Sequence, residues 1–237
     1  PNEYFKKVAD HFIHLKSGEV VKKVAVSFNQ LYLKEQGAGF LELGKNLVKK
    51  KAPVPKEPME FIGISEKEFL PYKNITTPSG KLCGSYASVV LFSYLQDHLM
   101  LTLPTTLRKI GQKKTDLLAE KLIYFIQKHG LPTVPFQVAL GWKRFFHYYH
   151  IKQGVFFQNF GARKTSEKLL QEKNPFLLGV LRIFRSEYGN HWVVCYAYGT
   201  YEGQTFYKIH DNWGNYEKII AATLGNGIVA IKNNVKV

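Results

Sequence analysis

The chain has 237 residues, a formal net charge of +15 and 45% hydrophobic residues. This content of apolar residues excludes an intrinsically disordered chain, because it is enough to bury a sizeable core. Two cysteines exclude a disulfide-rich scaffold, and no apolar run approaches the ~18–20 residues that span a bilayer. We therefore expect one large domain, or one domain with an appendage, and no transmembrane segment.

The excess of basic residues indicates the surroundings of the protein more than its chemistry. Short lysine runs are spread along the chain, at 6–7, 22–23, 49–51 and 113–114. Such a surface is either simply solvated or attracts an anionic partner such as a cell-wall polymer or an anionic lipid. No basic stripe with interleaved aromatic residues repeats at helical or strand spacing, so we expect no specific nucleic-acid binding.

Residues 1–57 predict an N-terminal helical arm. Helical spacing of apolar residues occurs at 4–15, 27–33 and 40–48, and a weak strand-like alternation occurs at 20–28. The prolines of 52–58 forbid a helix and predict an extended linker. The arm is either a propeptide-like regulatory segment or a packed part of the main domain, residues 58–237.

The main domain predicts helices first and strands afterwards. Helical segments are expected at 64–69 with Ser65 as cap, 83–99, 116–129 with Thr115 as cap, 135–150 broken or loosened at Gly141, and 164–172 with Thr165 or Ser166 as cap. Strands are expected at 176–184, 192–199, 205–210 and 227–232, and a loop at 74–80. This order favours an α+β fold in which helices pack on one antiparallel sheet.

Cys83 stands at the start of the first long predicted helix. A nucleophilic cysteine has to be a thiolate, and the free N–H groups and dipole of a helix N-terminus lower its pKa from about 8.5. Gly84, directly after it, would leave room for a substrate backbone. The alternative is a small buried core residue, which is the commonest role of a free cysteine.

His191 and Asp211 complete a possible catalytic set. His191 begins a predicted strand 108 residues after Cys83 (191 − 83), and Asp211 follows it by 20 residues (211 − 191) after the next strand. The two residues are therefore expected near the open end of one hairpin, where a carboxylate can hold the orientation and tautomer of an imidazole. Each alone also fits a surface or turn position; their order predicts a thiol nucleophile with its base.

These three motifs resemble those of papain-clan cysteine peptidases, and most closely the bacterial group related to bacteriocin-leader peptidases. The matching segments are Leu-Cys-Gly-Ser-Tyr-Ala-Ser-Val-Val-Leu at 82–91, Asn-His-Trp-Val-Val at 190–194 with a later Gly199, and Asp-Asn-Trp-Gly at 211–214. The resemblance covers roughly residues 61–231 and implies a papain-like fold.

The same resemblance implies a set of roles. Cys83 would be the nucleophile, His191 the general base and acid, and Asp211 the orienter, with Trp213 shielding the bond between the last two. The reaction would be hydrolysis of a peptide bond in a polypeptide through a thioester acyl-enzyme, without a metal or organic cofactor. The enzyme would be secreted or wall-associated in a Gram-positive bacterium, and a chain that begins at Pro1 fits a form from which a signal peptide has been removed.

The sequence departs from the family at the oxyanion site. These enzymes place a Gln about six residues before the nucleophile, and Thr77 occupies that position here. A side-chain donor could come from Thr77, Ser79 or Asn74, beside the backbone N–H of Cys83. In an alternative register, Cys83 aligns with a structural cysteine of papain, so that Tyr86 takes the nucleophile position and the protein is inactive.

Two other functions stay open: a non-catalytic papain-like module that binds a surface partner, and a cell-wall amidase of the same clan. Cys195 lies four residues after His191 in the predicted strand, so we expect it in the core and not in a disulfide with Cys83. The pairs His11/His14 and His147/His150 have helical spacing but no clustered acidic or thiol ligands, so we expect surface histidines and no metal site.

Overall fold

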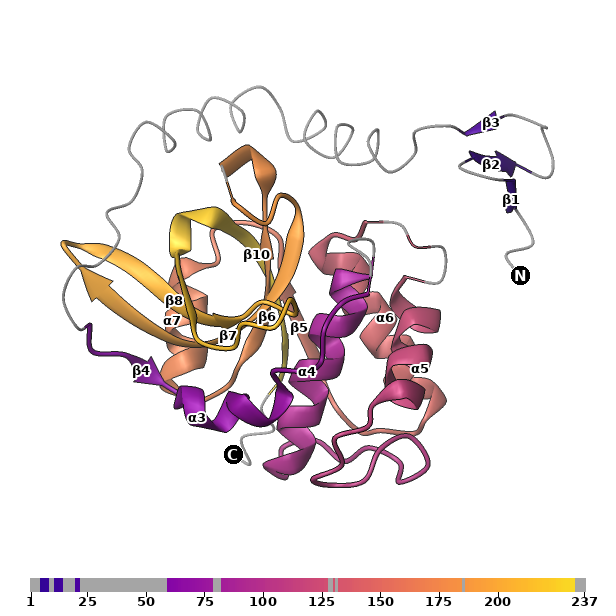
Figure 1. Cartoon of the computed structure of the whole chain (residues 1–237), viewed down its shortest axis with the longest axis horizontal. Helices are drawn as coiled ribbons and strands as arrows, with labels where there is room; N and C mark the ends of the chain where they lie inside the picture. Colours follow the sequence, from indigo (N-terminus) through magenta and orange to yellow (C-terminus); the bar gives the residue numbers. More distant parts are fainter. Residues whose placement is uncertain are drawn as a thin grey trace. The chain divides into compact units, whose positions relative to one another are not determined.

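The computed structural model describes residues 5–8, 11–14, 20–21, 59–78, 82–127, 130, 132–184 and 186–232 (Figure 1). The chain divides into two compact units, Pro1–Asn46 and Leu47–Val237. The predicted boundary between residues 57 and 58 lies outside the described residues.

The first unit contains a small antiparallel sheet in the order β1-β2-β3. Its strands are β1 (Phe5–Val8), β2 (His11–His14) and β3 (Val20–Val21). The predicted helix at 4–15 is therefore wrong where the structure describes it, because four-residue strands are too short for apolar spacing to separate strand from helix. The strand expected from residue 20 is confirmed at β3, and the helices expected at 27–33 and 40–48 lie outside the described residues.

The second unit combines helices with one antiparallel sheet, which confirms the α+β class. Its helices are α3 (Glu66–Phe69), α4 (Cys83–Asp97), α5 (Asp116–Ile126), α6 (Pro135–Tyr148) and α7 (Arg163–Gln171). Its strands are β4 (Ile62–Gly63), β5 (Val155–Gln158), β6 (Phe176–Val180), β7 (His191–Tyr201), β8 (Gln204–His210), β9 (Lys218–Ala221) and β10 (Gly225–Ile231). The order is β5-β10-β6-β7-β8-β9, with β4 paired to β7.

Strand β7 is covered on both faces. Trp192 and Val194 belong to the apolar cluster that includes α4, whereas Val193 and Cys195 belong to a second cluster with Leu170 of α7. The alternation follows the two-residue period of a strand, and a strand buried on both sides explains the continuous apolar run in the sequence. Figure 1 shows α4 between the sheet and the pair α5 and α6.

Helix α4 is buried nearly all round, including its small polar residues. The Ser88 hydroxyl donates to the Gly84 carbonyl (2.7 Å) and accepts from the Trp142 indole N–H of α6 (2.8 Å). A helix between two layers needs such partners for each polar group, since an unpaired buried group is costly. These bonds fix the first turn of α4, where Cys83 lies, against α6.

Several predicted helix details are wrong. Thr165 and Ser166 lie inside α7, whose N-cap is Ala162. Thr115 is the N-cap residue of α5 as predicted, but its side chain makes no capping hydrogen bond. Ser65 does cap α3, by accepting from the Lys67 N–H (3.4 Å). In the part of the chain that the structure describes, no helix is long and apolar enough to cross a membrane.

Helix α6 continues through Gly141 without the predicted interruption. A Cβ atom at Gly141 would lie 2.7 Å from Ile126 Cγ1 and 2.9 Å from the Phe125 carbonyl oxygen of α5. The glycine is therefore a contact point at which two helices approach closely, and its missing side chain serves packing rather than flexibility.

We predict that Gly141→Ala lowers the free energy of unfolding by about 1–2 kcal/mol, because overpacking against α5 outweighs the gain in helix propensity of up to about 1 kcal/mol. Urea unfolding followed by circular dichroism measures the change. Leu140→Ala, at the neighbouring exposed position, is the control and should cost much less. A stabilised Gly141→Ala variant would contradict the close packing.

Candidate active site

Cys83 is the first residue of α4 and its side chain is almost enclosed, with 5% of its surface exposed. Burial raises the pKa of the thiol, whereas the backbone N–H of Trp192, and then those of Gly84 and Cys83 itself, lower it. The thiol thus faces both the free N–H groups of a helix start and the backbone of β7. The residue before Trp192 is His191.

Gln127 anchors the helix start that carries Cys83. Its Oε1 accepts from the Ser85 N–H (2.8 Å) and from the Ser85 hydroxyl (2.9 Å), so a residue just after α5 satisfies a donor of the first turn of α4. The N-cap residue Leu82 has no side chain that could do so. The position of the thiol is therefore set partly by a residue far away in the chain.

Gly84 has a different role from the one expected. A Cβ atom there would lie 2.9 Å from Thr133 Oγ1 and 3.2 Å from Trp192 Cδ1. The protein's own side chains fill the space that the sequence interpretation reserved for a substrate backbone. The glycine is needed because Trp192, which also donates to Thr133 Oγ1 (3.1 Å), packs directly against the helix start.

His191 begins β7, is only 3% exposed and is oriented by a short hydrogen bond. Its Nε2 lies 2.7 Å from the backbone carbonyl oxygen of Asp211. Since a carbonyl can only accept, Nε2 carries the proton in the neutral ring, and Nδ1 keeps the lone pair of a base. Burial lowers the pKa of His191, and the carbonyl and charge of Asp211 act in the opposite direction.

The two shifts point to a neutral pair at rest. A thiol with a raised pKa and an imidazole with a lowered pKa are both uncharged at about pH 7. The groups that lower the Cys83 pKa in the described part of the chain are backbone N–H groups, and the imidazole is not among them. Chemistry at this site would need proton transfer to His191 during attack, rather than a thiolate formed beforehand.

The Asp211 side chain lies elsewhere than the sequence predicted. Its carboxylate is fully buried and accepts from the N–H groups of Trp213 (2.8 Å) and Asn215 (3.0 Å), the side-chain amide of Asn215 (2.7 Å) and the hydroxyl of Tyr188 (3.2 Å). The contact with His191 is made by the main chain of Asp211. The predicted residue is present, but its carboxylate holds a turn.

Aromatic rings enclose the imidazole. The Trp213 ring centroid lies 4.5 Å from that of His191, and the Tyr188 ring is nearly parallel to His191 at 5.6 Å. Trp213 is 47% exposed, so this residue is partly open to solvent. The structure thus brings Trp213 beside His191, where the resemblance expects it.

Of the two possible oxyanion donors that the structure describes, Thr77 lies against the turn that follows Asp211. Its backbone N–H donates to the Asn212 carbonyl (2.7 Å), in the turn that follows Asp211. Its hydroxyl oxygen is buried and has no hydrogen-bond partner among the described residues. Asn74 is exposed, and Ser79 lies outside the described residues.

His210 and Tyr188 have structural contacts to the site that sequence reasoning missed. His210 is fully buried, with Nε2 3.0 Å from the Tyr72 carbonyl oxygen and Nδ1 accepting from the Asn212 N–H (3.2 Å). Both residues adjoin a motif, Tyr188 three before His191 and His210 one before Asp211. Their closeness to a motif in the sequence could have pointed to these two residues, whereas nothing in the sequence around Gln127 pointed to its role.

Cys195 is buried in the core and free, as predicted, and Cys83 is free as well. His147 lies in α6, and side chains of the pair His11/His14 lie outside the description. Within the described ranges, no group of three or more potential ligands could hold a metal ion.

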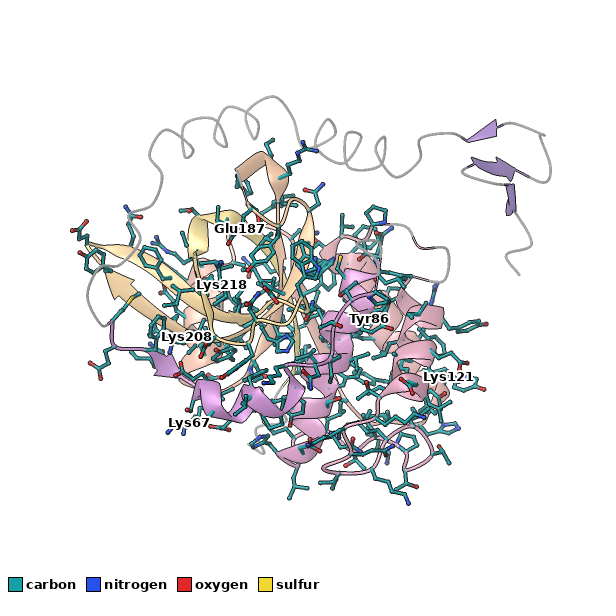
Figure 2. The ribbon with its side chains drawn as sticks, viewed as in Figure 1. Lys67, Tyr86, Lys121, Glu187, Lys208 and Lys218 are labelled. Atoms are coloured by element: carbon teal, nitrogen blue, oxygen red, sulfur yellow. The ribbon has the colours of Figure 1, made fainter. Side chains whose placement is uncertain are left out.

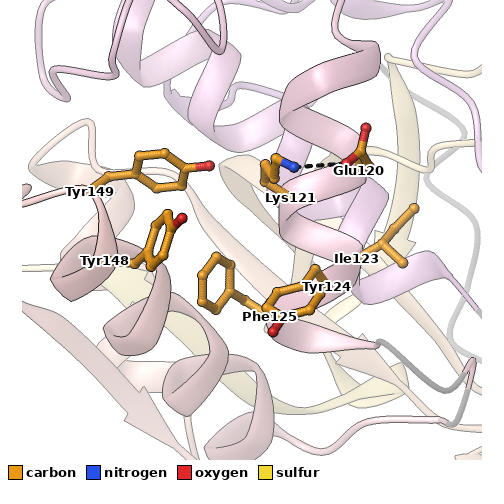
Figure 3. Close-up of a pocket in the computed structure, with 7 residues that line it drawn as sticks. All are labelled: Glu120, Lys121, Ile123, Tyr124, Phe125, Tyr148 and Tyr149. Carbon is orange, nitrogen blue, oxygen red and sulfur yellow. Dashed lines mark hydrogen bonds and ion pairs between the residues drawn. The ribbon is translucent and has the colours of Figure 1, made fainter. Parts of the chain in front are cut away.

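Figure 3 shows a separate hollow of about 400 Å³ beside α5 and the end of α6. Its lining consists of Glu120, Lys121, Ile123, Tyr124, Phe125, Tyr148 and Tyr149. None of the predicted site residues lines it, so it is distinct from the Cys83–His191 region.

Comparison with known proteins adds no name to this site. No model of a known protein family matches the chain, and no curated protein matches it.

We predict that acid weakens the fold through its buried histidines. Burial lowers the pKa of His191 and of His210. Below about pH 6.5 these histidines are protonated in the unfolded chain but stay neutral in the folded chain. Each histidine therefore lowers the free energy of unfolding by up to about 1.4 kcal/mol per pH unit, until the pH reaches its pKa in the folded chain. Stability is retained above that window.

Urea unfolding at about pH 7.5 and about pH 5 measures this loss. His210→Gln should lose less free energy of unfolding on acidification than the parent protein, whereas His147→Gln, at an exposed position, should behave like the parent. Equal losses in all three proteins would contradict the assignment.

Proposed function

We propose that the protein is a cysteine peptidase with a papain-like fold, in which Cys83 is the nucleophile and His191 the general base and acid. One observation carries the proposal. The Cys83 thiol, at the start of α4, faces the backbone N–H of Trp192, which is the residue after His191. The imidazole of His191 is anchored through Nε2 and keeps a lone pair on Nδ1. These are the elements that a thiol nucleophile and its base require.

The proposed reaction proceeds in two stages. As the sulfur attacks the carbonyl carbon of a peptide bond, His191 Nδ1 takes the thiol proton, and the carbonyl oxygen becomes an oxyanion near the N–H of Cys83. The imidazolium then gives this proton to the leaving amine, the C–N bond breaks, and a thioester remains. In the second stage His191 takes a proton from water, the resulting hydroxide displaces the thiolate, and the sulfur is protonated again.

A non-catalytic binding module is the second candidate, and two observations favour it. The thiol is nearly enclosed with a raised pKa, and the Asp211 carboxylate is occupied by four other donors. Both candidates share the fold and differ in whether His191 can activate the sulfur.

The motifs suggest the class of substrate, and the net charge suggests the location of the protein. We propose a polypeptide substrate and a secreted or wall-associated protein, because a net charge of +15 favours contact with anionic wall polymers. A cell-wall amidase with the same catalytic groups would cut a different amide.

Alkylation of Cys83 by iodoacetamide tests the central pair. If His191 activates the sulfur, His191→Ala should slow labelling of Cys83 at neutral pH by roughly 10²-fold, the lower range for general-base assistance. Mass spectrometry of the Cys83 peptide gives the rate, and His147→Ala is the matched control. Equal rates in the parent protein and His191→Ala would reject the peptidase and leave the binding module.

Incubation with two substrates then separates peptidase from amidase. A peptidase should create new amino termini in an unfolded protein, and Cys83→Ala should abolish them. New termini in purified peptidoglycan, with none in the protein, would assign the amidase instead.

We predict that Thr77 supplies the second oxyanion donor. Thr77→Val removes the hydroxyl and preserves the shape, so kcat should fall by about 10²–10³-fold, whereas Thr77→Ser should retain most activity. Steady-state kinetics on the peptide substrate measures the effect. An unchanged kcat in Thr77→Val would show that the hydroxyl does not face the oxyanion.

A further inference from the structure

The Asp211 main chain and side chain serve different partners. The carbonyl oxygen accepts from His191 Nε2 (2.7 Å), and the carboxylate accepts four hydrogen bonds from the turn and from Tyr188. The carboxylate therefore determines where the carbonyl lies. The main chain closes the same turn, because the Asp211 N–H donates to the Asn215 carbonyl (2.9 Å).

A buried carboxylate needs its donors. Asp211 is fully buried, and a desolvated charge of this kind is stable only when hydrogen bonds replace the lost water. Three of its four donors, from Trp213 and Asn215, belong to the turn itself. The fourth, the Tyr188 hydroxyl, comes from the segment that leads into His191, and so it joins the turn to the strand that carries the imidazole.

Tyr188 contacts both parts of this arrangement. Its hydroxyl donates to Asp211 Oδ2 (3.2 Å), and its ring lies nearly parallel to the imidazole of His191. Burial raises the pKa of Tyr188, so the hydroxyl stays protonated as a donor.

The backbone around Tyr188 is held as well. The Tyr188 N–H donates to the Ser186 hydroxyl (3.2 Å), and Glu187 pairs with Lys218 of β9 (3.3 Å). Figure 2 labels both members of this ion pair. Tyr188 therefore reaches Asp211 from a loop that is tied to its surroundings.

We propose that Tyr188 is a positioning residue for His191, acting through the Asp211 carboxylate and thereby through the Asp211 carbonyl. This inference rests on the proposed function, since it assigns what holds the proposed base. The carbonyl keeps the proton on Nε2 and leaves Nδ1 as the base atom. The carboxylate makes no hydrogen bond to the imidazole itself; it acts by holding the turn that carries the Asp211 carbonyl, and by its charge.

The test measures His191 directly, by ¹⁵N NMR of the full chain with labelled histidine. Two readouts are followed: solvent exchange of the Nε2 proton and the pH midpoint of the ring. Tyr188→Phe keeps the ring and removes only the bond to Asp211. Tyr94→Phe is the matched control, because the Tyr94 hydroxyl also donates to a carboxylate, Glu68, at 3.2 Å.

Tyr188→Phe should speed exchange of the Nε2 proton about fivefold, the factor for one ordinary hydrogen bond. It should also move the midpoint upward, because the Asp211 charge loses one of its donors. Asp211→Asn should move the midpoint downward, since the charge itself is gone while the carbonyl remains. The Tyr188 hydroxyl, whose ring stacks on the imidazole, and the nearby thiol of α4 are both uncharged in this range.

The control separates positioning from plain stability. Both Tyr→Phe variants should lower the urea midpoint, and only Tyr188→Phe should change the His191 signals. If Tyr188→Phe lowers stability but leaves exchange and titration unchanged, the positioning role is rejected. The proposed function fails by a different measurement, the alkylation of Cys83 in His191→Ala, so the two outcomes are distinguishable.

Discussion

The burial of β7 on both faces is the constraint on which the rest of the structure depends. One face packs against α4 and the other against α7, so the strand can neither slip nor turn without disrupting the packing of both apolar clusters. Because α4 is held against this strand and begins at Cys83, the thiol is brought to the backbone beside His191. The position of the candidate site is thus a consequence of core packing, and the two residues need no direct bond to stay near one another.

The electrostatics of the site favour neutral groups. Burial raises the pKa of Cys83 and lowers that of His191, and the nearby charge of Asp211 is offset by four donors. In such an arrangement the resting thiol is not ionised. It suits a nucleophile that is activated only when a substrate displaces water and the proton passes to the imidazole, and it equally suits a thiol that never reacts. The chemical question therefore concerns proton transfer from the thiol to the imidazole.

Local patterns predicted the five helices and four of the strands in the described part of the main domain, but missed β4, β5 and β9 and extended β6 beyond Val180. The helix at Cys83 and the strand at His191 follow from apolar periodicity and from glycine and proline positions, which act within a few residues. Thr115 is the N-cap residue of α5 as predicted, without a side-chain capping bond, whereas the cap expected at Thr165 or Ser166 was wrong because α7 begins two residues before Thr165, at Arg163. The helix predicted at 4–15 was wrong because short apolar spacing fits two conformations.

The sequence by itself determined the α+β class and the three motifs that hold Cys83, His191 and Asp211, whereas the order of helices before strands was wrong at β4 and β5. Only the tertiary structure decided how these residues meet. Whether a carbonyl or a carboxylate faces the imidazole depends on a turn closed by Asn215 and on Tyr188, and the helix start depends on Gln127. These contacts join segments whose separation along the chain carries no periodic signal, so they arise only when the sheet and helices pack.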